Sequence, residues 1–94
     1  MPGEDENITK AVIYRELSEI QSITEETPPL DVAKMLQIAF IIKQEARSVN
    51  EKVKDIADQL YDELMSYNEK IQENTNTQLP AKIKELIDNL FDEI

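Results

Sequence analysis

The sequence contains no histidine and no cysteine, and Gly3 is its only glycine. Without histidine or cysteine, the chain cannot form a Ser-His or Cys-His nucleophile, an ordinary zinc site or the Glu-x-x-His di-iron site of helical bundles. A single glycine also leaves no glycine-rich loop that could hold a phosphate group. We therefore expect a protein that is not an enzyme and that uses no metal and no cofactor.

The sequence also lacks long apolar runs. The longest covers residues 38–42, whereas a membrane-spanning helix needs about 20 apolar residues. The first residues show no basic stretch followed by an apolar one, so we expect no secretory signal. The absence of cysteine excludes disulfides. We expect a soluble, cytoplasmic protein with no membrane partner.

Basic residues are scarce: 10 Lys and Arg stand against 20 Asp and Glu, which gives a formal net charge of −10. This charge opposes binding to nucleic-acid backbones and to anionic lipid. It would steer a basic protein partner toward the chain. Acidity also keeps a small protein soluble without any partner, so both interpretations of the charge stay open.

The residues that are abundant favour helix. Apolar residues make up 40% of the 94 residues, which is too many for a disordered acidic chain, and helix-forming residue types dominate. A chain of this length forms one domain at most. We predict an all-α protein with a disordered acidic tail at residues 1–6 and a single helical domain at residues 7–94.

Apolar residues recur at helical spacing through residues 30–73, a segment without proline or glycine. Steps of four and three residues alternate up to Leu60, as in a coiled-coil heptad, and predict one apolar stripe along a helix. Two successive steps of four, from Ile56 to Leu60 to Leu64, interrupt the heptad but continue the stripe. The stripe consists of Met35, Ala39, Ile42, Ala46, Val49, Val53, Ile56, Leu60, Leu64, Tyr67 and Ile71.

Two architectures fit this stripe. In the first, residues 48–51 form a capping box that starts a new helix, and an antiparallel bundle contains four helices at about 8–24, 30–47, 49–73 and 80–93. In the second, one long central helix covers residues 30–73, and two short helices fold back on it. That shape is too thin to hide its core as a monomer, so it would be oligomeric. A faint internal repeat, in which residues 53–64 resemble residues 83–94, favours the bundle.

Further signals mark the ends of the first helix. Asn7 or Thr9 can cap its start, and Pro28 and Pro29 break the chain after it. Its predicted core face is Ile8, Val12, Ile13, Leu17, Ile20 and Ile23, with Tyr14 beside it. The last helix should bury Ile83, Leu86 or Ile87, Leu90 and Ile94.

Two groups of residues are candidates for a partner surface. The helix from Leu30 is apolar on nearly every side, so we predict that it is the most enclosed segment. Its cluster Phe40, Ile41 and Ile42 could exceed what three other helices cover and form a self-association surface. The second group lies on an acidic ridge, for which the ordinary interpretation is a solvated outer face and the functional one is a contact surface for a basic partner. The ridge contains Glu51, Asp55, Asp58, Asp62, Glu69 and Glu73, and its candidate partner residues are Asp55, Asp58, Asp62 and Glu69.

These observations predict a non-catalytic helical module for protein–protein interaction or assembly. Its partner would be a protein, basic or a second copy of the chain, and not a nucleic acid. The alternative is a small acidic inhibitor, such as an antitoxin, an immunity protein or a nucleic-acid mimic, that occupies a basic site. Binding that weakens with salt would support mimicry.

Overall fold

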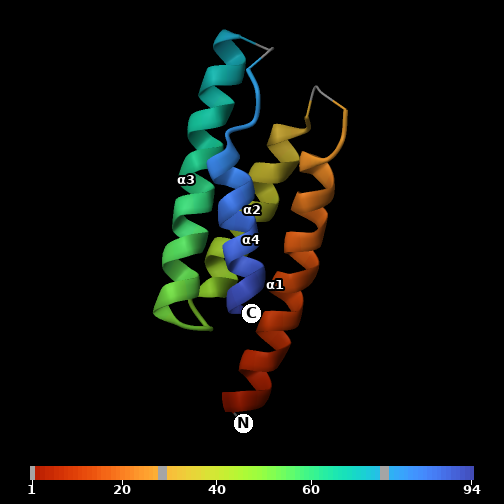
Figure 1. Ribbon diagram of the computed structural model, residues 1–94. Helices are drawn as coiled ribbons and strands as arrows, with labels where there is room; N and C mark the ends of the chain where they lie inside the picture. The colour runs from red at the N-terminus through yellow and green to blue at the C-terminus, as the bar shows by residue number, and fades with distance from the viewer. Residues whose placement is uncertain (1, 28–29, 75–76) are drawn as a thin grey trace.

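In the computed structural model of the chain, residues 2–27, 30–74 and 77–94 are described, and within them four helices form an antiparallel bundle (Figure 1). Each helix runs opposite to the one before it. Contacts join α1 to α2, α2 to α3, α3 to α4 and α4 back to α1, and the α1–α4 contact is the least extensive. The predicted all-α four-helix bundle is confirmed. Its helices are α1 Pro2–Thr24, α2 Val32–Ala46, α3 Glu51–Glu73 and α4 Ala81–Glu93.

The helix α1 begins at Pro2, earlier than the start at Asn7 or Thr9 that the capping signals predicted. A proline is tolerated in the first helical turn because its missing N–H would have no helical partner there. The first turns of α1 project beyond the other helices (Figure 1). Ile8 was predicted to belong to the core, but it is 64% exposed, so that prediction is wrong. The disordered tail at residues 1–6 stays a prediction, and the side chains of those residues are not described.

The chain breaks between α2 and α3, so the alternative with one long central helix is wrong. Asn50 adopts extended backbone angles (φ −167°, ψ 172°) and caps α3. Its side-chain Oδ1 accepts a hydrogen bond from the Val53 N–H at 2.9 Å, which satisfies a donor that the helix itself leaves unpaired. The sequence placed this cap two residues earlier, at Ser48. The break was predicted correctly, but the capping residue was not.

The apolar stripe lines one core although it is divided between two helices. Because α2 and α3 pack against each other as a hairpin, the two halves of the stripe face the same interior. In α4 the two alternatives Leu86 and Ile87 are both buried, since α4 meets α3 on one side and α1 on the other. The buried residues of the stripe are Met35, Ala39, Ile42, Ala46, Val53, Leu60, Leu64 and Tyr67.

Polar contacts hold the two ends of the α3–α4 hairpin. The Tyr67 hydroxyl donates to the Thr77 carbonyl oxygen at 3.0 Å, which ties α3 to the connector before α4. Burial raises the pKa of Tyr67 above its ordinary value of 10.0. At the opposite end, Lys52 Nζ lies 2.9 Å from Glu93 Oε1, and the exposure of this pair limits what it adds to stability.

Two aromatic pairs lie on opposite sides of the bundle. Tyr14 of α1 meets Phe91 of α4 edge to face, with ring centroids 5.3 Å apart. Phe40 of α2 meets Tyr61 of α3 with centroids 6.0 Å apart. In both pairs the tyrosine lies on the first helix of a hairpin, α1 or α3, and the phenylalanine on the second helix of a hairpin, α2 or α4. This is what two equivalent hairpins, α1–α2 and α3–α4, would produce.

Candidate protein-interaction surface

The helix α2 has one buried side and one exposed side, although nearly all its residues are apolar. Ile42 is fully buried, whereas its neighbours Phe40 and Ile41 are 48% and 43% exposed. We predicted α2 to be enclosed on several sides, and for its outward side that prediction is wrong. The physical reason is that four helices form a single ring around the core, so each helix keeps an outward face.

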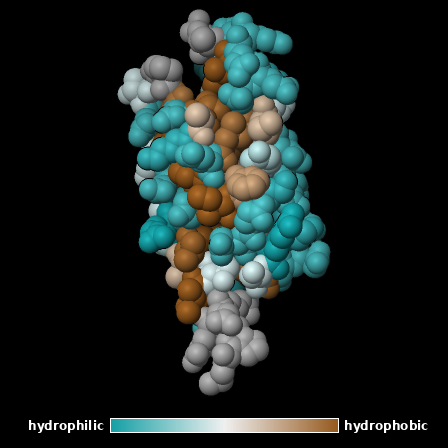
Figure 2. Space-filling model, turned by 180° about the vertical axis from the view of Figure 1, so that it is seen from behind, coloured by the Kyte–Doolittle hydropathy of each residue, from teal (hydrophilic) through white to brown (hydrophobic). Residues whose placement is uncertain are grey.

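The outward residues of α2 form a row along the helix, which we call the α2 face. Ala33, Gln37, Phe40 and Gln44 recur at steps of four, three and four residues, and Ile41 lies four residues after Gln37, which places all five on one side of the helix. In Figure 1 α2 lies at the rear of the bundle, and Figure 2, seen from behind, shows an apolar strip along this side between hydrophilic margins. Leu36 is half-buried at its edge. The α2 face consists of Ala33, Gln37, Phe40, Ile41 and Gln44, all exposed and uncharged, and Lys34, the remaining exposed residue of α2, lies at its edge.

One edge of the α2 face is held in place by α3. The Phe40 ring is tilted by 58° against the half-buried Tyr61 ring, and Lys43 Nζ lies 4.8 Å from the centroid of the same Tyr61 ring. Aromatic contacts and cation–π contacts of this kind are favourable. They restrict the Phe40 side chain before any partner arrives, which lowers the entropy that binding would cost.

The structure separates the predicted partner residues into three environments. Phe40 and Ile41 belong to the α2 face, and Ile42 belongs to the core. The acidic ridge lies on the outward side of α3, with Asp55, Asp62 and Glu69 exposed. The α2 face and the acidic ridge are therefore the outward faces of neighbouring helices.

Asp58, the fourth candidate residue on the acidic ridge, differs from the other three candidates. It is half-buried, and its Oδ2 lies 3.7 Å from Lys54 Nζ, one turn earlier on α3. Among the described residues, its Oδ1 is buried without a hydrogen-bond partner. A carboxylate that is partly covered and already paired offers less to a basic partner than the exposed acids beside it.

The chain segment that carries the α2 face has a charge signature that sequence reasoning missed. Residues 32–47 contain the three basic side chains of Lys34, Lys43 and Arg47 and only one acidic side chain, Glu45. The chain as a whole carries a net charge of −10. A local count of charges along the sequence would have marked this segment as the one whose sign opposes the rest.

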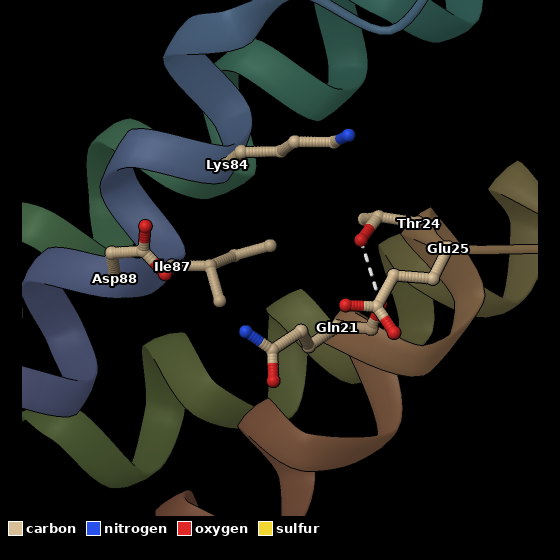
Figure 3. A pocket seen from close by; sticks show the side chains of 6 residues that line it. All are labelled: Gln21, Thr24, Glu25, Lys84, Ile87 and Asp88. Atoms are coloured by element: carbon tan, nitrogen blue, oxygen red, sulfur yellow. Dashed lines mark hydrogen bonds between the residues drawn. The ribbon is translucent and has the colours of Figure 1, made fainter.

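A shallow hollow of about 200 Å³ lies between α1 and α4. Figure 3 shows α4 residues facing the end of α1 across it, with the Thr24 hydroxyl donating to the Gln21 carbonyl oxygen at 2.6 Å. The volume is below the about 300–1,000 Å³ of usual ligand sites, and charges of both signs line its rim. It therefore offers a weaker candidate site than the α2 face. The lining residues are Gln21, Thr24, Glu25, Lys84, Ile87 and Asp88.

Comparison with protein-family models, with curated proteins and with solved structures finds no match for this chain. In the described part of the chain, no three His, Cys, Asp or Glu side chains are placed to hold a metal ion. Over the same residues, each helix is too short or too polar to cross a membrane. The α2 face is therefore interpreted from its own residues.

Proposed function

We propose that this protein is a non-catalytic helical module for protein–protein interaction and that it binds its partner through the α2 face. The single observation that carries the proposal is the uncharged row of Ala33, Gln37, Phe40, Ile41 and Gln44 on a chain of net charge −10. Isolated exposed apolar residues are ordinary, but apolar residues that gather in a strip along one side, as in Figure 2, mark a contact surface.

The physical driving force is burial of this strip. Each Å² of apolar surface removed from water contributes about 25 cal/mol, and Phe40 and Ile41 are each more than two-fifths exposed. Phe40 is the anchor, because aromatic residues held in place by neighbours dominate binding energies. Gln37 and Gln44 lie beside it and can exchange hydrogen bonds with a partner's rim.

The shape of the surface suits a helical partner. The α2 face follows a helix of 15 residues, about 22 Å long at 1.5 Å per residue. An amphipathic helix laid along it would present apolar side chains three and four residues apart. Its packing against α2 would resemble the helix–helix contacts inside the bundle.

Site-specific photocrosslinking in the cells that produce the protein tests this proposal. A benzophenone side chain replaces Gln37 on the α2 face or, as the matched control, Gln59, an exposed glutamine on α3. We expect discrete adducts from position 37 that disappear when Ile41→Glu is added, and none from position 59. Equal adducts from the two positions, or none from position 37, would contradict the proposal.

A second candidate function, a small acidic inhibitor, is favoured by the exposed row of Asp55, Asp62 and Glu69 on α3. These carboxylates would occupy the site of a basic protein and imitate a phosphate backbone. Binding of this kind weakens steeply with salt. It would be lost in the triple variant Asp55→Asn, Asp62→Asn, Glu69→Gln and retained in Ile41→Glu. Capture of a basic protein that is insensitive to salt would exclude this function.

A further inference from the structure

We propose that the partner on the α2 face is a second copy of this chain, packed antiparallel about a two-fold axis. This inference rests on the proposed function of the α2 face and goes further by naming the occupant. It follows from where the charges lie on α2.

Two copies of net charge −10 repel each other. They can therefore associate most easily through the surface that carries the least negative charge. The helix α3 carries seven acidic and three basic residues, and α2 carries two lysines and one glutamate. Of the helices of the bundle as described, α2 alone has more basic than acidic residues. Contact through α2 therefore joins two copies where like-charge repulsion between them is smallest.

The flank of the α2 face is self-complementary. Lys34 and Glu45 are eleven residues apart, which is three turns at 3.6 residues per turn, so they lie on the same flank. That flank is opposite the one on which Lys43 meets Tyr61. Within the described residues neither Lys34 nor Glu45 forms an ion pair, and Lys34 is exposed while Glu45 is half-buried.

An antiparallel two-fold pairing uses these two charges twice. A two-fold axis perpendicular to the helix pair brings each flank against the same flank of the other copy, running in the opposite direction. Lys34 of one copy then faces Glu45 of the other, and the reverse pair forms at the far end. This register places Phe40 and Ile41 of both copies next to the axis, where the apolar contact is centred. The helix α4, which does not contact α2, lies on the far side of each copy.

Measurement of molar mass tests the occupant. By light scattering and sedimentation equilibrium, we expect the purified protein to have twice the 10.9 kDa of one chain. Ile41→Glu should give a monomer. The matched control Met65→Glu, at a residue on α3 that is 40% exposed, should stay a dimer, and circular dichroism confirms that both variants are helical. A wild-type monomer at every concentration reached overturns the inference.

Charge exchange tests the antiparallel register. Lys34→Glu or Glu45→Lys alone replaces two attractive contacts by two repulsive ones, and we expect the dissociation constant of the dimer to rise about tenfold. The double variant should recover the wild-type value, and an equimolar mixture of the two single variants should form heterodimers preferentially. A dimer indifferent to these changes overturns the antiparallel pairing.

The two proposals can fail separately. If position 37 crosslinks to a different protein while the purified chain is a monomer, the α2 face is an interaction surface but its occupant is not a second copy. If position 37 gives no adduct and the chain is a monomer, both proposals fall.

Discussion

The cap at the start of α3 allows a quantitative test of how the chain folds. Replacing Asn50 by alanine removes the oxygen that accepts the Val53 N–H at 2.9 Å. That N–H lies in the first turn of α3, where the helix supplies no acceptor. The bond is part-buried and the Val53 side chain is fully buried, so water replaces the lost acceptor poorly. We expect Asn50→Ala to cost about 1–2 kcal/mol, the upper half of the range for such caps.

Urea unfolding followed by circular dichroism measures this loss. In a domain of this size each 1 kcal/mol corresponds to a fall in Tm of about 4–8 °C. Ser48→Ala is the control, since Ser48 precedes the cap and is exposed; its effect should stay within about 0.5 kcal/mol. If Ser48→Ala costs as much stability as Asn50→Ala, then Ser48 caps α3 through the capping box predicted from the sequence. That result would refute the assignment of the cap to Asn50.

Three further changes probe the core and the alkaline limit of stability. Leu60→Ala should cost about 2–5 kcal/mol because Leu60 is fully buried. Met65→Ala, at a residue that is 40% exposed, should cost no more than about 0.5 kcal/mol. Equal urea midpoints for the two variants would contradict the burial pattern. Tyr67→Phe removes the hydrogen bond to Thr77 and should cost about 1 kcal/mol at neutral pH. Burial raises the pKa of Tyr67 above 10.0, so the unfolded chain loses this proton first. The contribution of Tyr67 is therefore complete below pH 10 and declines above it, and urea midpoints across alkaline pH should fall less steeply in Tyr67→Phe.

Much of this architecture could be predicted from the sequence because it depends on local patterns. The stripe from Met35 to Tyr67 predicts the core side of α2 and α3, since residues three and four apart always share a side of a helix. The break before α3 is also local, because asparagine and serine compete with the helix for backbone hydrogen bonds. The sequence did not determine the residue that caps α3, since Ser48 and Asn50 are both good caps.

The composition alone excluded sites that depend on histidine or cysteine. The spacing of apolar residues along the sequence specified four helices and most of the core. Only the tertiary structure decided which side of α2 faces water. Phe40, Ile41 and Ile42 are all apolar, and a helix that is apolar on nearly every side has no preferred orientation of its own. Packing between α1 and α3 set that orientation, buried Ile42 and left Phe40 and Ile41 exposed, because one ring of four helices can cover only the inner side of each member.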